Sequence, residues 1–255
     1  MRVIIVTVAG LSTRFSQSIG RSCLKCIYHE KDIRESLLYR ILKGSPQADK
    51  FVIVGGFLFE ELKETIDSKF GEFQDKILLV KNEKFEEYGS GYSLYMGLLA
   101  IKNMEFDEVV FAEGDLWVDG EDYTRVWDCR RDVITCSREP VLASKSVAFY
   151  YDRNYHIHYI FDTSHSLLEI GQPFRGIFNS GQIWKFVSRK RVLHVMDSLT
   201  EEEWKETNLK FVQEYFDGID KEGYELIEFK KWINCNTVDD FLKIENEENR
   251  NDTFR

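Results

Sequence analysis

The feature that most constrains the fold is an alternation, up to residue 112, of short apolar runs with stretches of helical periodicity. The apolar runs are Val3–Val8, Phe51–Val54, Ile77–Val80 and Val109–Ala112. Between them, apolar residues recur at helical spacing over Glu35–Lys43, Leu58–Lys69 and Ser93–Lys102. Parallel strands need long crossover connections, and helices usually supply them. The pattern therefore predicts an α/β fold with a Rossmann-like, mainly parallel sheet flanked by helices.

The rhythm changes after about residue 130. Three β-rich runs follow one another without intervening helices, at Asp132–Cys136, Val147–Tyr151 and His156–Phe161. This succession predicts an antiparallel extension of the sheet. Later segments predict a helix start over Ser198–Trp204, a helix over Leu209–Phe216, a strand over Tyr224–Phe229 and a final helix over Val238–Ile244. We expect the charged tail, 246–255, to fray.

Composition narrows the class of protein. The 255 residues suit one domain, and the net charge of −10 argues against partners such as nucleic acid or an anionic membrane. The apolar opening Val3–Val8 is too short to span a membrane. Five cysteines, an odd number, argue against a disulfide framework and favour a cytoplasmic location. Cys23 and Cys26 form a CxxC, but no second CxxC accompanies it, so we expect two packing residues around Lys25.

A small-residue loop with nearby cations is the strongest functional signal. It follows the first predicted strand and reads Ala9-Gly-Leu-Ser-Thr-Arg14, with Lys25 further on. Exposed backbone N–H groups of such a loop can surround phosphate oxygens, while Arg14 and Lys25 supply positive charge. The chain contains neither GxxxxGK[ST] nor GxGxxG. The loop alone also fits an ordinary turn after a strand.

A second signal is the carboxylate that ends the run Val109-Val-Phe-Ala-Glu-Gly-Asp115. Open α/β sheets bind ligands at the carboxyl ends of their strands. Asp115 is therefore a candidate Mg²⁺ ligand, because Mg²⁺ prefers carboxylate oxygens and retains several waters. Glu113 shares the strand face of Asp115, so it either supports the site or packs. A strand-end acid that caps a turn is the structural alternative.

These segments resemble the sugar-nucleotide and phosphocholine type of nucleotidyltransferases, whose fold is of the GT-A type. The family motif, GxGTR followed by PK, has its counterpart in Gly10–Arg14 and Leu24-Lys25, with Ser12 replacing a glycine and Cys23-Leu24 replacing the proline. The resemblance implies that Arg14, Lys25 and Asp115 are catalytic. It also implies a nucleotide-binding set of Ala9, Gly10, Leu11, Ser12, Thr13, Arg14, Lys25, Asn82, Ser90, Gly91, Ser93 and Glu113.

Weaker likenesses place the remaining parts of the site. The segment Trp232–Phe241 is similar to the family's EIDTxxDL and makes Asn236 a second metal ligand, although Asn236 or Thr237 could instead cap the following helix. Tyr88–Leu94 resembles the base-selecting loop of the cytidylyltransferases, and Asn179-Ser180-Gly181 resembles an acceptor-side element. The acceptor-binding candidates are Trp117, Asn179 and Trp184. Four aromatics, Trp117, Tyr151, Trp184 and Trp232, either enclose a quaternary ammonium or belong to the core.

By this resemblance the chain is expected to be one domain, with 1–130 as its nucleotide-binding half and 131–245 as its acceptor-binding half. The expected activity is Mg²⁺-dependent transfer of CMP from CTP to a small phosphorylated acceptor, with pyrophosphate released. A sugar-1-phosphate uridylyl- or thymidylyltransferase is the nearest alternative. A GT-A-like glycosyltransferase and a non-catalytic nucleotide-binding protein are alternatives of another class. A homo-oligomer is compatible with the sequence. His156, His158 and His165 form no catalytic motif, and no GxSxG elbow indicates a hydrolase.

Overall fold

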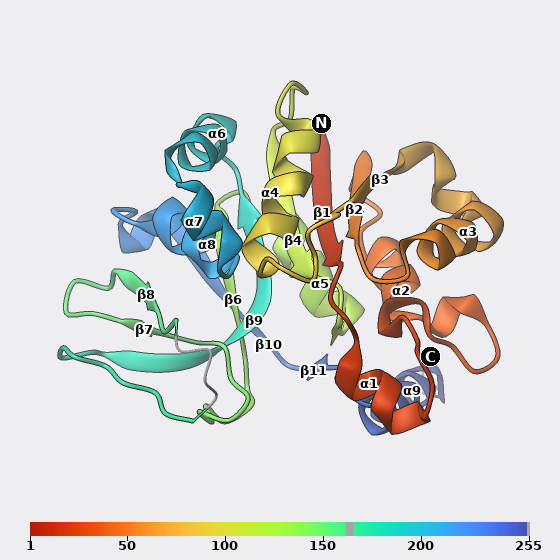
Figure 1. Cartoon of the computed structure of the whole chain (residues 1–255). Helices are drawn as coiled ribbons and strands as arrows, with labels where there is room; N and C mark the ends of the chain where they lie inside the picture. The colour runs from red at the N-terminus through yellow and green to blue at the C-terminus, as the bar shows by residue number, and fades with distance from the viewer. Residues whose placement is uncertain (162–165, 254–255) are drawn as a thin grey trace.

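A nine-stranded sheet runs through the centre of the computed structural model, which describes residues 1–161 and 166–253 (Figure 1). Its parallel half has the order β3-β2-β1-β4. These strands are β1 (Arg2–Val8), β2 (Lys50–Gly55), β3 (Ile77–Lys81) and β4 (Glu108–Glu113). The predicted Rossmann-like half is therefore confirmed.

The direction of the strands reverses at β9 (Gly176–Phe186), which pairs antiparallel with β4. Beyond it lie β6 (Asp132–Ser137) and then β10 (Tyr224–Phe229), which is parallel to β6. The other end of β9 pairs with β7 (Ala148–Tyr151), and β7 pairs with β8 (Ile157–Tyr159). The antiparallel extension is thus confirmed, with the third strand shorter than expected.

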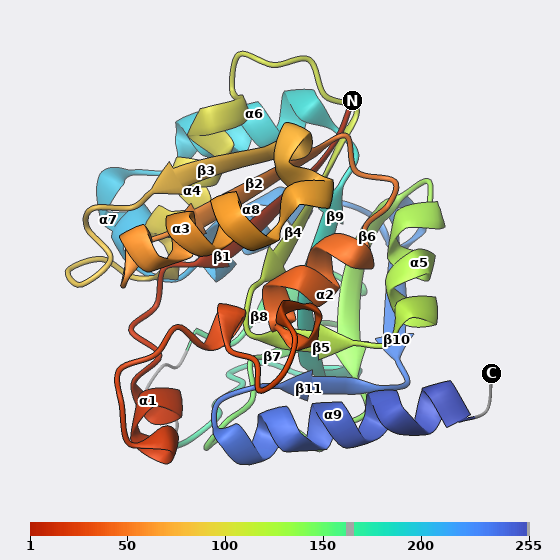
Figure 2. The ribbon, with the colours of Figure 1, turned by 90° about the vertical axis from the view of Figure 1, so that its right-hand side faces the viewer.

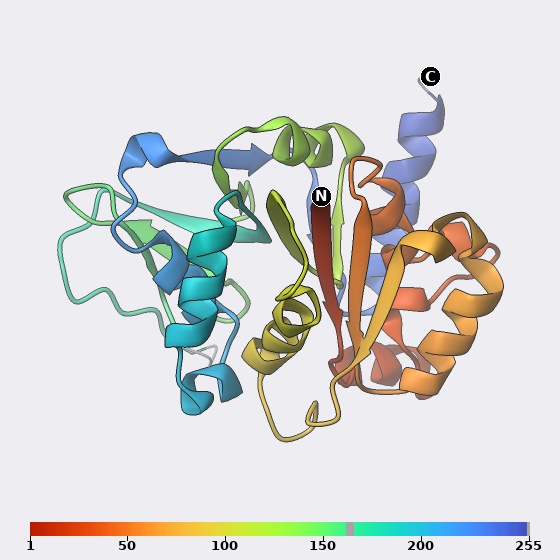
Figure 3. The same cartoon turned by 90° about the horizontal axis from the view of Figure 1, so that it is seen from above.

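Helices cover both faces of the sheet (Figure 3). One apolar cluster includes α4 (Ser90–Ile101), α6 (Arg189–Ser198) and α8 (Leu209–Phe216). The opposite cluster includes α2 (Leu37–Lys43), α3 (Phe59–Lys69) and α5 (Gly120–Asp128). Successive side chains of β1 alternate between the two clusters, as the two-residue period of a strand requires. The central strand is therefore buried on both faces.

A smaller layer closes the carboxyl end of the sheet (Figure 2). It contains α1 (Thr13–Ile19), α9 (Val238–Thr253) and the two-stranded sheet of β5 (Leu116–Val118) and β11 (Trp232–Asn234). The segment expected to fray from residue 246 is part of α9 as far as Thr253, and acids of this helix make contacts as far as Glu248. Arg40 bonds Glu245 at 2.5 Å, and the Trp117 indole donates to Glu248 at 2.6 Å.

Two helices, α2 and α7 (Glu201–Lys205), begin later than the sequence predicts because a polar side chain caps them elsewhere, whereas α4 begins three residues earlier than predicted, at Ser90 in place of Ser93. Ser36 accepts from the N–H of Tyr39, so α2 begins at Leu37 and a 3₁₀ turn, Ile33–Glu35, precedes it. Thr200 and Glu203 form a capping box that starts α7, whereas Ser198 ends α6. Further 3₁₀ turns cover Lys25–Ile27, Gly71–Lys76 and Lys221–Gly223. Within the described ranges, no helix is long and apolar enough to cross a membrane.

Candidate functional site

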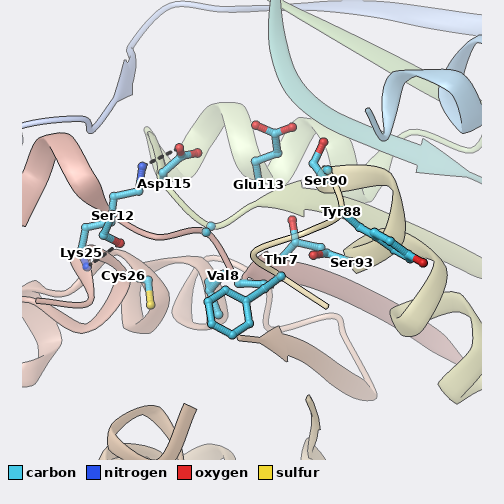
Figure 4. A pocket seen from close by; sticks show the side chains of 15 residues that line it. Thr7, Val8, Ser12, Lys25, Cys26, Tyr88, Ser90, Ser93, Glu113 and Asp115 are labelled. Carbon is cyan, nitrogen blue, oxygen red and sulfur yellow. Dashed lines mark hydrogen bonds and ion pairs between the residues drawn. The ribbon is translucent and has the colours of Figure 1, made fainter. Parts of the chain in front are cut away.

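A pocket of about 300 Å³ opens at the carboxyl ends of β1 and β4 (Figure 4). The chain passes from β1 outward to β2 and β3 and then returns to β4 on the other side of β1. Such a topological switch point is where open α/β sheets bind ligands. The pocket brings together eight predicted residues, Ala9, Gly10, Ser12, Lys25, Ser90, Ser93, Glu113 and Asp115.

The loop after β1 forms one wall of this pocket. Ser12 adopts a left-handed conformation with φ 52°, which turns the chain from the strand into α1. No acceptor in the described part of the chain takes the N–H groups of Gly10 and Leu11. These donors are therefore available to an anion. The side chains of Leu11 and Thr13 do not line the pocket, so only their backbone could serve the predicted role.

An ion pair forms part of the lining of the pocket. Lys25 Nζ donates to Asp115 Oδ2 at 2.8 Å, and the two side chains are 19% and 23% exposed. The 3₁₀ turn beginning at Lys25 directs it toward the end of β4, and the backbone N–H of Cys235 fixes Asp115 by donating to its carbonyl oxygen. Asp115 Oδ1 is buried without a partner. The site thus offers the Lys25 ammonium group and one carboxylate oxygen, Asp115 Oδ1, that has no hydrogen-bond partner.

Glu113 lies beside this pair, and one of its oxygens is held by a distant element. Asn208, the residue before α8, donates its amide to Glu113 Oε1 at 2.7 Å. Burial and then the charge of Asp115 raise the pKa of Glu113 to about 7, while Asn208 and Lys25 oppose the shift. Two carboxylates therefore share the pocket: Asp115 is paired with the Lys25 ammonium group, whereas Glu113 is held by the neutral amide of Asn208.

The opposite wall is aromatic and contains a hydroxyl whose orientation is determined by its neighbour. Phe85 and Tyr88 line this wall together with Ser93. Asn82 is fully buried; its Oδ1 accepts from the N–H of Lys84 at 2.9 Å, so its Nδ2 must be the group that donates to Ser93 Oγ at 3.0 Å. The Ser93 hydroxyl hydrogen remains available to the pocket. Asn82 therefore orients Ser93 and is not itself part of the lining.

Arg14 and Asn236 contact each other outside the lining of the pocket. Arg14 Nη2 donates to Asn236 Oδ1 at 2.9 Å, and Asn236 Nδ2 donates to Asn234. The amide oxygen that the metal prediction requires is thus occupied by a guanidinium. Asn236 does not cap α9, but Thr237 does, because its Oγ1 accepts from the N–H of Asp240; Asp240 Oδ2 in turn accepts from the N–H groups of Asn236 and Thr237. The contact joins α1 to the start of α9, which sequence reasoning did not anticipate.

Two of the acceptor-site predictions are wrong. Trp184 is 0% exposed, stacks on Phe111 and donates to the Tyr159 hydroxyl, so it is a core residue. Trp117 is 3% exposed and is covered by α9. The third candidate, Asn179, is also buried, but its Nδ2 donates to Ser137 and its Oδ1 has no partner. The structure therefore leaves the role of Asn179 open to a ligand.

The other expected aromatic enclosure does not form, because its members belong to separate clusters. Tyr151 packs with Phe149 and Tyr224 in one core, whereas Trp232 lies at the edge of the opposite one. His156 and His158 both face Asp152 on the β7–β8 hairpin, and His165 lies outside the described residues. Among the residues that are described, no group of three or more His, Cys, Asp or Glu side chains could hold a metal ion.

The two cysteines of the CxxC point into different apolar clusters. Cys23 packs with α1 and α9, whereas Cys26 packs against the face of the sheet covered by α2. Burial raises the pKa of Cys26 to about 12, so its thiol is a poor nucleophile. The packing interpretation thus agrees with the structure.

Sequence reasoning missed Thr7, Phe85 and Asn208. Thr7 and Phe85 line the pocket, and Asn208 binds two residues that line it. The signal for Thr7 was its place near the end of a buried strand, where side chains approach the ligand crevice. Gly91, predicted to bind nucleotide, is instead a point of close approach, because a Cβ there would lie 2.8 Å from the carbonyl oxygen of Trp204.

Comparison with solved structures identifies the class of fold. The inositol-1-phosphate CTP transferase from T. maritima aligns with a TM-score of 0.67 at 17% identity, covering 96% of each chain. The CTP:phosphocholine cytidylyltransferase from Streptococcus pneumoniae aligns at 0.62 and 16% identity, covering 96% of this chain and 99% of that one. A UDP-glucose pyrophosphorylase aligns at 0.68 and 11% identity, covering 98% and 99%. The chain therefore has the fold of the nucleotidyltransferases.

The family can also be stated. The family model described as Domain of unknown function (DUF6564) matches residues 21–248, and the chain belongs to this family. A comparison with curated proteins gives no match.

Proposed function

We propose that this protein is a Mg²⁺-dependent nucleotidyltransferase that transfers CMP from CTP to a small phosphorylated acceptor. The observation that carries the proposal is the Lys25–Asp115 pair, at 2.8 Å, facing a loop with free N–H donors at the switch point of the sheet. A triphosphate needs concentrated positive charge, and a metal-bound one also needs a carboxylate. A pocket for an uncharged ligand needs neither.

The chemistry proposed is an in-line displacement. An oxygen of the acceptor phosphate attacks the α-phosphorus, a new phosphoanhydride bond forms, and the bond between the α-phosphorus and its bridging oxygen to the β-phosphate breaks. The electron pair leaves with pyrophosphate. Lys25 and the N–H groups of Gly10 and Leu11 would bind phosphate oxygens and stabilise the negative charge of the leaving group. Because both substrates are anions, their alignment and the neutralisation of their charge are the main tasks of the protein.

The residues present fit a magnesium ion. Asp115 would hold it through Oδ1, the buried oxygen that lacks a partner, and Mg²⁺ is commonly bound by one or two carboxylates together with substrate phosphates and water. When bound, the ion would supply charge neutralisation at the phosphates. Binding of the metal-bound triphosphate would also weaken or break the hydrogen bond between Lys25 and Asp115, since Lys25 would then bind the phosphates.

The preference for CTP rests on the wall of the pocket formed by Phe85, Tyr88 and Ser93, here called the base-side wall, and on likeness to solved cytidylyltransferase structures. Phe85 and Tyr88 offer rings against which a base can pack, and Ser93 offers a hydroxyl donor for an acceptor atom such as the O2 of a pyrimidine. Two of the structural relatives have CTP in their names, one with phosphocholine and one with inositol 1-phosphate. Asn179, which lies near the start of β9 and has an unpartnered Oδ1, is the candidate contact for the acceptor.

The test is pyrophosphate release, measured with Mg²⁺ and each of CTP, UTP, dTTP, ATP and GTP against a panel of acceptors. The panel contains phosphocholine, phosphonates, inositol and sugar phosphates. Release should require CTP and one acceptor class, and Asp115→Ala should lower the rate by about 10²–10³-fold. A matched control is the exposed Lys63–Asp67 pair of α3, an ion pair at 2.6 Å, where Asp67→Ala should leave the rate unchanged.

Two outcomes would refute nucleotidyl transfer, and a third would refute only the choice of CTP. A folded protein that binds no triphosphate with Mg²⁺ would exclude nucleotidyl transfer. Transfer or hydrolysis of a finished UDP-sugar without any use of free triphosphates would favour a GT-A-like glycosyltransferase. Release that depends on UTP or dTTP with a sugar 1-phosphate would keep the reaction class and replace CTP.

A further inference from the structure

Glu113 has one oxygen that the protein holds and one that it leaves to the pocket. Oε1 accepts the amide of Asn208 at 2.7 Å. Within residues 1–161 and 166–253, no donor bonds Oε2, and Oε2 is not among the buried polar atoms that lack a partner. Since Glu113 lines the pocket, Oε2 is accessible from it. The carboxylate is thus oriented from behind and presents an acceptor in front.

The position of Glu113 along the pocket indicates which part of a nucleotide meets it. Figure 4 places Glu113 between the Lys25–Asp115 pair and the wall with Ser90 and Tyr88. The first end has the charge that suits phosphates, and the second has the rings that suit a base. In a nucleoside triphosphate, the group between phosphates and base is the sugar.

The chemistry of a carboxylate agrees with this position. In its ionised form Glu113 would repel phosphates, whereas sugar hydroxyls are donors and a carboxylate accepts from them, as in the dinucleotide-binding folds where an acid binds ribose. A hydrogen bond to a charged group contributes more than one between neutral groups.

We propose, resting on the proposed function, that Glu113 is a specificity-determining residue that accepts a hydrogen bond from the 2′- or 3′-hydroxyl of a bound ribonucleotide. Asn208 acts as its positioning residue. Asn208 is fully buried; its amide holds Oε1, and its backbone N–H donates to Ser90 Oγ at 3.1 Å. One residue thus aligns the sugar-side acid with the base-side wall. A contact with the 2′-hydroxyl would favour ribonucleotides over 2′-deoxynucleotides and so separate CTP and UTP from dTTP, whereas a contact with the 3′-hydroxyl would bind all three.

The experiment is calorimetric binding of CTP, 2′-deoxy-CTP and 3′-deoxy-CTP, and of the corresponding uridine nucleotides, each with and without Mg²⁺. The wild-type protein should bind at least one deoxy analogue about tenfold or more weakly than its ribonucleotide. Glu113→Leu should bind the ribonucleotide as weakly as the analogue and leave the affinity of the analogue within about threefold. Glu113→Gln, which keeps shape and an acceptor, should retain part of the discrimination, and Asn208→Ala should reduce it.

The outcomes separate this proposal from the proposed function. Equal affinity of the wild type for all three sugars would overturn the ribose contact and leave triphosphate binding intact. An equal loss of Mg²⁺-dependent affinity for ribo and deoxy forms in Glu113→Leu would assign Glu113 to the metal instead. Failure of the wild type to bind any triphosphate would remove the proposed function and the ribose contact with it. Thermal melting of each variant establishes that it is folded.

Discussion

The most informative perturbation is a double-mutant cycle on Lys25 and Asp115, with Lys25→Met, Asp115→Ala and the double variant. Each side chain is expected to act on the same triphosphate from opposite ends of a 2.8 Å contact. Removing one charge-stabilising group costs about 10²–10³ in rate, or roughly 2.7–4 kcal/mol of transition-state stabilisation. Independent effects would multiply to about 10⁴–10⁶. We expect only about 10³ in the double variant, because residues that act as a unit are not additive.

The same cycle has a separate signature in stability. Lys25→Met leaves a partly buried carboxylate with no counter-charge and with Oδ1 still unpartnered, which should lower the free energy of unfolding by about 1–3 kcal/mol. The double variant removes both charges and should be more stable than Lys25→Met alone. The assays are steady-state kcat/KM by pyrophosphate release and chemical denaturation. A rate loss below threefold in either single variant, or fully multiplicative losses, would refute the reasoning.

Three other predictions follow from the structure. The Lys185 side chain is 1% exposed and bonds Glu108 and the carbonyl oxygens that end α5. Lys185→Met should therefore lower the free energy of unfolding by about 3–5 kcal/mol and Tm by roughly 6–20 °C, measured by scanning calorimetry. A smaller shift in Tm would mean that water enters the site and solvates Glu108. A Cβ at Gly89 would lie 2.1 Å from the carbonyl oxygen of Glu206, so Gly89→Ala should lower the free energy of unfolding by about 1–3 kcal/mol and weaken triphosphate binding. Gly71 has open space around it, so Gly71→Ala should have neither effect. Chelation of divalent cations should abolish turnover but leave the Tm of the nucleotide-free protein unchanged. In the described part of the chain, no cluster of three or more acidic, histidine or cysteine side chains could hold a structural metal. A lower Tm after chelation would contradict this prediction.

Local pattern was sufficient for the parallel half of the fold. Each predicted strand of that half is present, because continuous apolar runs are typical of strands buried on both faces and β1 is such a strand. The helix over residues 189–198 was missed because its buried positions, Val192, Val195 and Met196, stand among charged neighbours. Capping displaced two other boundaries, where Ser36 and Thr200 compete with nearby polar residues for the helix start.

Residue type located the candidate site, and long-range contacts corrected it. Gly10, Lys25 and Asp115 could be singled out because their types suit a phosphate and a cation and because strand ends meet at one edge of the sheet. Trp117 and Trp184 were misassigned because an aromatic side chain suits a ligand or a core equally well. Only their surroundings distinguish the two roles.

The sequence by itself determined the α/β class, the four strands of the parallel half and the loop after the first strand, since these depend on periodicity and on neighbours in the chain. Tertiary structure alone decided that Arg14 bonds Asn236, that Asn208 orients Glu113 and that the tail forms a helix to residue 253. Arg14 and Asn236 are 222 positions apart, and Glu113 and Asn208 are 95 apart. No local pattern predicts contacts between residues so far apart in the chain, because these contacts form only after the packing of apolar faces has brought the elements together.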